Sequence, residues 1–269
     1  MPRPTFALAL ALLAAGTGAT GLAAQDKSGP DFSWDGVITP GHVLVVRNLN
    51  GAIRVAKSDG DRASVTGVKR WRRGNPADVR IEQMKGSATG DVVICAFWSD
   101  NASCDERSYR SHNDGGWPWR DRNDVSVEFT IKLPPGVRVV VTTVNGDVSV
   151  EDATAEVEAA SVNGSVWAAS AGGPVRAHTV NGDVRARMGT RGTSDLHFST
   201  VNGTVIVQVP DGADAELSMS TVNGSVQSDF PVTIQGRLNP RKLRATLGKG
   251  GPQLVMKTVN GDVRLRKLQ

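Results

Sequence analysis

The carboxylates and histidines of this sequence are the first side chains to consider for catalysis. Cleavage of a glycosidic bond needs two carboxylates, or a carboxylate and a base, on one surface. Glu156 and Glu158 stand close together, but the neighbouring outward positions carry Arg176, Arg185 and Arg187, so no acidic cluster forms. The four histidines, at positions 42, 112, 178 and 197, are dispersed, and no serine stands in a Gly-x-Ser-x-Gly elbow. We therefore predict no catalytic residues.

Calcium binding is a second candidate chemistry, because aspartates follow a recurring Asn-Gly pair. Asp147, Asp183 and Asp262 occupy this place in three copies, whereas the other copies carry serine or threonine. Calcium takes six to eight oxygen ligands, and the Gly-Gly-x-Gly-x-Asp pattern of calcium-binding repeats is absent. We interpret the aspartates as satisfied polar turns and predict no metal site and no cofactor.

Arginine beside tryptophan offers a third chemistry, which is recognition. Residues 69–73 read KRWRR, and the polar stretch 99–124 contains a Trp-Pro-Trp sequence. Exposed tryptophan beside arginine is common in recognition surfaces. Two further basic stretches, 237–244 and 264–267, are interpreted as solvated strands whose lysines and arginines guard open sheet edges. The candidate binding residues are Arg70, Trp71, Arg72, Arg73, Trp117 and Trp119.

The composition indicates which elements must position these side chains. Glycine accounts for 30 of 269 residues and aromatic residues for only 5%, against an average glycine content of about 7%. Many tight turns and a core of small and branched side chains favour short β-strands over a helical bundle. The ordinary apolar content argues against a disordered chain, a collagen or a polytopic membrane protein.

The first 24 residues have the layout of a secretory signal peptide. Arg3 is followed by an apolar stretch from Phe6 to Ala15 and then by small residues up to Ala24. This stretch is too short to span a bilayer as a helix, which takes about 20 residues. We predict an exported protein, in the periplasm or at the cell surface, with no transmembrane helix in the mature chain.

Export bears on the two cysteines, Cys95 and Cys104. An oxidising compartment permits a disulfide between them. A metal site would need more ligands nearby, and a redox pair usually has the closer C-x-x-C spacing. We predict a structural disulfide that closes a hairpin, with two free thiols as the alternative.

A hexapeptide of the form Thr/Ser-Val-Asn-Gly-Asp/Ser/Thr-Val occurs six times, and a weaker copy stands at 49–53. Successive asparagines of the six copies are 18, 18, 21, 21 and 37 residues apart. A near-constant period of this size is the signature of a solenoid or array. The predicted corner residues are Asn50, Gly51, Asn145, Gly146, Asn163, Gly164, Asn181, Gly182, Asn202, Gly203, Asn223, Gly224, Asn260 and Gly261.

Between the copies, apolar and polar residues alternate as in β-strands with one buried face. Asn-Gly between strands also fits type I′ hairpins, so an antiparallel meander or sandwich is the alternative fold. Stacked coils gain more from identical repeats, because asparagines in register can form a hydrogen-bonded ladder and identical valines can fill the interior. We therefore predict an all-β chain built as a β-solenoid, whose corners need a φ open chiefly to glycine.

The sequence divides into a signal peptide at 1–24, an N-terminal β region at 25–140 and the repeat solenoid at 141–269. The last two are expected to be continuous as one domain. Residues 43–55 resemble one coil around Asn50-Gly51, and strands are predicted at 63–68, 78–84, 91–98 and 125–133. The stretch 99–124 is long for a loop, which is typical of either disorder or function.

With these features, the chain resembles the bacterial putative-adhesin family of exported domains of unknown function. The resemblance rests on LNGAIRV at 49–55 ahead of the turn SDGD at 58–61, on LPPGV at 133–137, on the TVNGD copies, and on the closing TVNGDVRLRK. It covers nearly all of the mature chain and implies a β-solenoid of the cell envelope with no known reaction. The cysteines and tryptophans of 99–124 do not map onto the family pattern.

Together these observations predict a non-catalytic adhesive, binding or scaffolding module of the cell envelope. The net charge is a modest +4. Outside the cytoplasm, the partners open to basic clusters are anionic envelope polymers, lipid head groups or another envelope protein, and not nucleic acid. The alternative function is a periplasmic carbohydrate-active enzyme, a lyase or hydrolase, on a β-helix.

Overall fold

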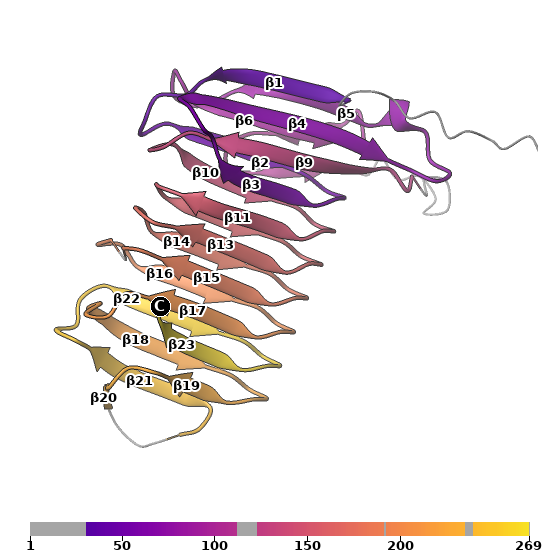
Figure 1. Ribbon diagram of the computed structural model, residues 1–269. Coiled ribbons are helices and arrows are strands. Elements are labelled where there is room, and N and C mark those ends of the chain that lie inside the picture. Colours follow the sequence, from indigo (N-terminus) through magenta and orange to yellow (C-terminus); the bar gives the residue numbers. More distant parts are fainter. Residues whose placement is uncertain (1–30, 112–122, 191, 235–238, 269) are drawn as a thin grey trace, which may run out of the picture.

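Two long β-sheets face each other in the computed structural model, which describes residues 31–111, 123–190, 192–234 and 239–268. Figure 1 shows their strands stacked as a column that runs from β1 to β20. The predicted signal peptide and the candidate binding residues Trp117 and Trp119 lie outside the described residues.

The first sheet contains ten strands. In spatial order they are β1 (Phe32–Val37), β4 (Arg62–Arg70), β9 (Ser126–Leu133), β3 (Ile53–Lys57), β11 (Val148–Ala153), β13 (Val166–Ser170), β15 (Val184–Met188), β17 (Val205–Val209), β23 (Val263–Lys267) and β19 (Val226–Ser228).

The second sheet contains eleven strands. In spatial order they are β20 (Thr233–Ile234), β21 (Lys242–Leu247), β18 (Ala215–Ser220), β22 (Gln253–Lys257), β16 (Leu196–Ser199), β14 (Val175–His178), β12 (Val157–Ala160), β10 (Arg138–Thr142), β2 (Val43–Arg47), β6 (Val92–Phe97) and β5 (Arg80–Lys85). A small hairpin of β7 (Ala102–Cys104) and β8 (Tyr109–Ser111) and the 3₁₀ turn η1 (Pro76–Asp78) complete the described elements.

Each coil consists of a strand of the second sheet, an Asn-Gly corner and a strand of the first sheet. Strands of successive coils are parallel, as β12 is to β14 and β13 to β15. In β15, Val184, Ala186 and Met188 point into the column, whereas Arg185 and Arg187 are exposed. The predicted all-β solenoid is confirmed and the antiparallel meander is wrong. Among the described strands, antiparallel pairing is found at the two ends of the column and in the β7–β8 hairpin.

The coils do not stack in chain order at either end of the column. The coil of β2 and β3 lies between two others: the coil of β6 and β9 on one side, and the coil of β10 and β11 on the other. At the other end, the last coil of the chain consists of β22 and β23. It lies between the coil of β16 and β17 and the coil of β18 and β19. The long spacing between Asn223 and Asn260 holds β20 and β21, which cap β18 before the chain returns. The repeat pattern alone does not show this order.

A ladder of asparagine side chains runs along the corners. Each Nδ2 donates to the Oδ1 of the asparagine in the adjacent coil, at 2.6–2.8 Å. Each such hydrogen bond contributes on the order of 1 kcal/mol. The ladder follows the spatial order of the coils, which is Asn50, Asn145, Asn163, Asn181, Asn202, Asn260 and Asn223.

The corner glycines are needed because adjacent coils approach each other closely. A Cβ added at any of the seven would lie 2.0–2.3 Å from a backbone carbonyl oxygen of the adjacent coil. At Gly182 the φ is also +150°, a value that L-residues rarely adopt, but the φ of Gly164 lies outside the range +20° to +160°. The predicted φ requirement is therefore incomplete, because the contact between coils demands glycine even where φ does not.

The hydroxyl two residues before each asparagine bonds the same glycine carbonyl. These threonines and serines are buried and donate to the glycine oxygen of the adjacent coil at 2.7–3.0 Å. In the coil of β2 and β3, Asn48 takes this place and donates to Val127 O at 2.8 Å. The threonine or serine, the asparagine and the glycine of each corner thus form the same set of contacts with the adjacent coil.

The two valines of each repeat have different surroundings. The valine after the corner points into the core, as Val166 and Val184 do. The prediction that identical valines fill the interior is wrong for the valine before the asparagine, because the corner turns this side chain outward. Val162 and Val180 are 37% and 39% exposed, and Val222, in the last rung of the ladder, is 56% exposed.

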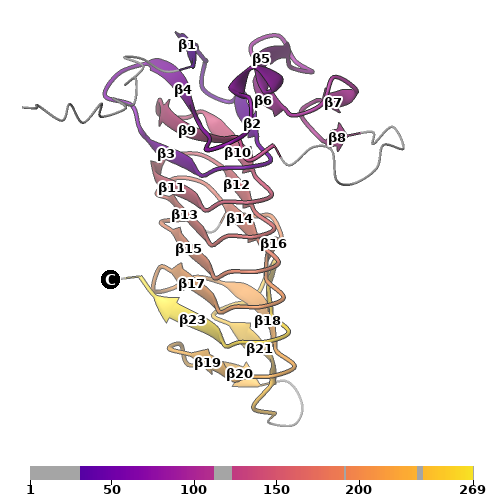
Figure 2. The same cartoon turned by 90° about the vertical axis from the view of Figure 1, so that its right-hand side faces the viewer.

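The two cysteines form a disulfide that fixes the β7–β8 hairpin on the outer face of the second sheet. The hairpin covers a small apolar cluster that includes Val45, Val93 and Phe97, and it lies beside β5 and β6 in Figure 2. Arg47 reaches under it from β2 and donates to the carbonyl oxygens of Asp105, at 2.9 Å, and Glu106. Burial lowers the pKa of Arg47. The hairpin is therefore an addition to the solenoid and not one of its coils.

Reduction of the disulfide is expected to release the hairpin and leave the coils folded. The closed loop contributes about 2–3 kcal/mol by the chain-entropy argument. The uncovered apolar cluster around Phe97 should bind a hydrophobic dye such as ANS, while the far-UV circular dichroism of the β-sheets persists. The Cys104→Ala protein should behave like the reduced protein. Loss of the whole β signal on reduction would contradict this division.

Candidate functional site

The candidate binding residues that the structure describes, Arg70 to Arg73, lie where the Asn-Gly corner is interrupted. In the coil of β6 and β9, the chain leaves the column at Phe97 and returns at Ser126. Val127 replaces the corner glycine: its N–H donates to Asn50 O at 2.7 Å, and its carbonyl oxygen lies against Gly51. The Trp98 indole closes the base of this excursion by donating to Val125 O at 3.0 Å.

The arginine loop (residues 70–74) extends from the end of β4 to the same place. Since β4 and β9 are antiparallel, Arg70 stands opposite Ser126. Arg70, Trp71, Arg72, Asp124 and Ser126 surround an open hollow of about 450 Å³. Trp71 is 40% exposed, and Arg72 and Arg73 are exposed beside it. The structure thus brings together four of the six predicted binding residues.

Asp124 is the residue of this site that the sequence did not reveal. Its carboxylate accepts hydrogen bonds from three consecutive backbone N–H groups, those of Gly74 at 2.7 Å, Arg73 at 3.1 Å and Arg72 at 3.4 Å. Hydrogen bonding from Gly74, joined by Arg73 and Arg72, lowers the pKa of Asp124. The only signal in the sequence is an aspartate that precedes a strand, which is too common to single out.

The charge of the arginine loop is only partly compensated. The Arg70 guanidinium lies 3.9 Å from Glu128, which for exposed groups is a weak pair. Lys69 donates to Pro76 O at 2.8 Å. Arg70 and Arg72 therefore line the same hollow as a carboxylate that is held by backbone N–H groups, an arrangement suited to binding anions.

The basic stretch at the C-terminus has a different setting. Arg264, Arg266 and Lys267 lie 2.8, 2.6 and 3.0 Å from the carboxylates of Asp262, Asp229 and Asp211. They belong to β23, which has β17 and β19 on its two sides. The interpretation that this stretch guards an open edge is wrong, because the last coil is inserted between two others.

The corner aspartates bond to the backbone of the adjacent coil. Asp147, Asp183 and Asp262 accept the N–H of the hydroxyl residue in the next rung at 2.7–2.9 Å. In spatial order, aspartate alternates with serine or threonine, so no two carboxylates are adjacent. Within the described ranges, no three His, Cys, Asp or Glu side chains gather closely enough to hold a metal ion.

Of the carboxylates and histidines considered for catalysis, Glu158, His178 and His197 lie on the second sheet, and Glu156 directly precedes its strand β12. Arg176 belongs to the same sheet, whereas Arg185 and Arg187 belong to the first. Glu156 pairs with Arg138, at 3.1 Å, and with Arg176. The His178 Nδ1 lies 3.1 Å from Ser199 Oγ on the outer face of the second sheet.

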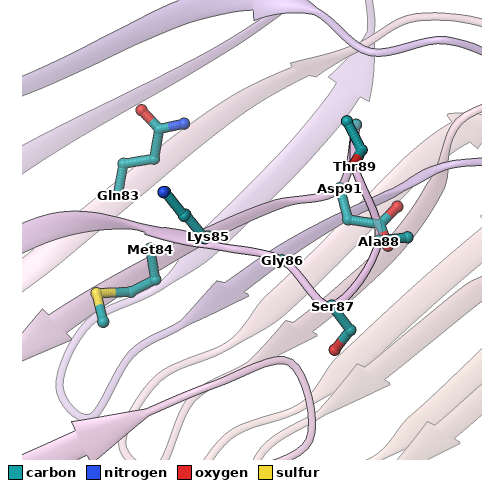
Figure 3. A pocket seen from close by; sticks show the side chains of 9 residues that line it. Gln83, Met84, Lys85, Gly86, Ser87, Ala88, Thr89 and Asp91 are labelled. Atoms are coloured by element: carbon teal, nitrogen blue, oxygen red, sulfur yellow. The ribbon is translucent and has the colours of Figure 1, made fainter.

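A further hollow, of about 630 Å³, lies over the turn between β5 and β6. Figure 3 shows that its labelled side chains, from Gln83 to Asp91, are spread along the turn and do not converge on one point. The Asp91 carboxylate is bonded at 3.0 Å both to the Val43 N–H and to the His42 ring. Burial alone would raise the pKa of Asp91, but these hydrogen bonds outweigh it and lower the pKa. Asp91 therefore joins the turn to β2.

The model of the Toastrack DUF4097 family matches residues 45–266, a range that includes all seven corners. The chain belongs to this family. The match extends over both sheets of the solenoid and over the excursion between β6 and β9, and it confirms the family resemblance found in the sequence.

Two solved structures are similar to this Toastrack chain. A putative cell adhesion protein from Clostridium sporogenes is 10% identical, with 88% of this chain and 99% of that chain covered and a TM-score of 0.45. A putative adhesin from Bacteroides fragilis is 11% identical, with 88% and 96% covered and a TM-score of 0.36. At these values the likeness says nothing of function. No curated protein sequence matches the chain.

The part of the chain that the structure describes contains no helix long and apolar enough to cross a membrane.

His178 predicts a mild dependence of stability on pH. Burial lowers its pKa, with smaller and opposing influences from Glu158 and from His197 and Arg176. The unfolded chain, with an ordinary histidine pKa near 6.5, therefore binds a proton that the folded chain resists. This contribution to stability is complete above about pH 6.5 and is lost as the pH falls towards the lower folded value.

The test is the urea-unfolding free energy of the protein between pH 7.5 and 5.5. The His178→Gln protein should show a flatter dependence than the unmodified protein. If the two proteins have the same slope, burial of His178 does not affect the stability in this range.

Proposed function

We propose that the protein is a non-catalytic binding or scaffolding module of the cell envelope, whose recognition surface is the arginine loop. The observation that carries this proposal is the position of Arg70, Trp71 and Arg72 around one hollow, with Arg73 exposed beside them, at one end of the column. Exposed arginine and tryptophan suit an anionic partner, because guanidinium groups bind carboxylates and phosphates through two hydrogen bonds at once.

The fold supports this assignment by fixing the base of the loop. β4 and β9 pair over seven residues, from Ser64 with Lys132 to Arg70 with Ser126. The arginines therefore extend from a paired strand end, and Asp124 holds the backbone of the loop that follows. Because the end of β4 is already paired with β9, little of its conformational entropy remains to be lost on binding, which favours affinity.

Export is part of the proposal. The signal-peptide layout of residues 1–24 supports a location of the mature protein outside the cytoplasm. The disulfide between Cys95 and Cys104 is consistent with an oxidising compartment. Anionic partners in that location are envelope polymers, lipid head groups and other envelope proteins.

The proposal is tested by retention of the purified protein on envelope fractions of its native host at low and high salt. Retention should fall steeply with salt, because exposed charges are screened. Replacement of Arg70, Arg72 and Arg73 by glutamine should abolish it. Replacement of Arg185, Arg187 and Arg264 by glutamine is the matched control: it removes the same charge from the outer face of the same sheet, at other levels of the column, and should leave retention unchanged.

Equal loss in both triple variants would show a nonspecific charge effect and contradict the assignment. Retention that salt does not weaken would also contradict it. Release of reducing sugar from any fraction would favour the alternative of a carbohydrate-active enzyme.

A further inference from the structure

The arginine loop contains an anion-binding site that the protein itself fills. The N–H groups of Arg72, Arg73 and Gly74 point to one carboxylate, that of Asp124. Consecutive backbone N–H groups that converge in this way form a concave site for an anion. A Cβ on Gly74 would lie 2.3 Å from Asn123 Oδ1 and 2.9 Å from Asp124 Oδ1, so glycine leaves the room that the carboxylate needs.

The surroundings of Asp124 differ from those of an ordinary turn aspartate. Asp105 in the β7–β8 hairpin also accepts two backbone N–H groups, from Arg107 and Ser108 at 2.7 Å. Asp124, in contrast, lines a hollow of about 450 Å³ together with Arg70, Trp71 and Arg72. Its carboxylate is exposed at one side of a space large enough for a sugar unit, and an aromatic ring lines the same space.

These features identify a class of ligand. The group already held by the backbone is a carboxylate, Arg70 and Arg72 in the same hollow suit further carboxylates, and the indole of Trp71, 40% exposed, adds apolar surface of the kind that sugar rings contact. We propose that the arginine loop binds a polysaccharide with carboxylate groups, and that Asp124 occupies the position of a ligand carboxylate until the ligand displaces it. This inference rests on the proposed function and adds both the ligand class and a built-in competitor.

The Asp124→Ala protein tests the competitor. When a site is open for only a fraction of the time, the apparent affinity is reduced by that fraction. If Asp124 fills the site for roughly nine-tenths of the time, its removal should tighten binding about tenfold. The measurement is titration calorimetry with alginate, a polymer of sugar carboxylates, at fixed salt, with neutral dextran as the blank. Circular dichroism shows whether the variant is folded.

Glu128→Gln is the matched control for charge. Glu128 lies 3.9 Å from Arg70 and is not bonded to the N–H groups of the loop, so its removal changes the local charge equally and leaves the anion site filled. Asp124→Asn is the second variant, for use if Asp124→Ala does not fold. It keeps an oxygen acceptor without the charge, so its gain in affinity should lie between those of Glu128→Gln and Asp124→Ala.

Three results would overturn the inference: no gain in alginate affinity with either Asp124 variant, an equal gain with Glu128→Gln, or tighter binding of inorganic polyphosphate than of alginate at equal charge. The failure of this inference is distinguishable from that of the proposed function. Salt-sensitive envelope retention that the arginine replacements abolish would stand even if the Asp124 variants behave like the unmodified protein.

Discussion

The close contact between glycine corners is the constraint on which the rest of the structure depends. A backbone carbonyl of one coil lies where the Cβ of the next corner residue would be, 2.0–2.3 Å away. Because the coils lie this close together, the asparagine side chains of adjacent coils bond directly, and the buried hydroxyls reach the same glycine carbonyls. The recurring tetrapeptide Thr-Val-Asn-Gly is therefore one packing unit in which all four residues bond or contact the neighbouring coil, the valine through its carbonyl oxygen, which accepts an asparagine N–H at 2.7–2.8 Å.

The candidate site exists because this constraint is relaxed at one level of the column. Beyond Asn50 the ladder has no further asparagine, and Val127 supplies only backbone contacts to the next corner. The chain is free to leave the column there, and it does so between Phe97 and Ser126. The disulfide hairpin and the loop that Asp124 holds both depend on this interruption. A regular solenoid surface thus carries its irregular, arginine-rich part at one end.

The repeats allowed the fold, the ladder and the coil around Asn50 to be predicted from the sequence. They did not reveal the order of the coils, because identical corners can stack in any sequence: Asn260 fits between Asn202 and Asn223 as well as it would beyond them. The outward turn of Val162 and its equivalents was also missed, since alternation does not extend through a corner. Asp124 has no motif, because its partners are backbone N–H groups fifty residues away. What the sequence showed was local and periodic, and what it hid depends on contacts between distant segments.

The most direct test of the corner constraint is the urea-unfolding free energy of two alanine variants. Gly164 has no φ that requires glycine but no room for a Cβ, whereas Gly212 has a φ of +85° and no atom within 4 Å of an added Cβ. If contact between coils controls the structure, Gly164→Ala should cost about 3 kcal/mol, and Gly212→Ala only the backbone strain of about 1 kcal/mol. A Gly164→Ala protein as stable as the unmodified one, with Gly212→Ala the more damaging change, would contradict the account.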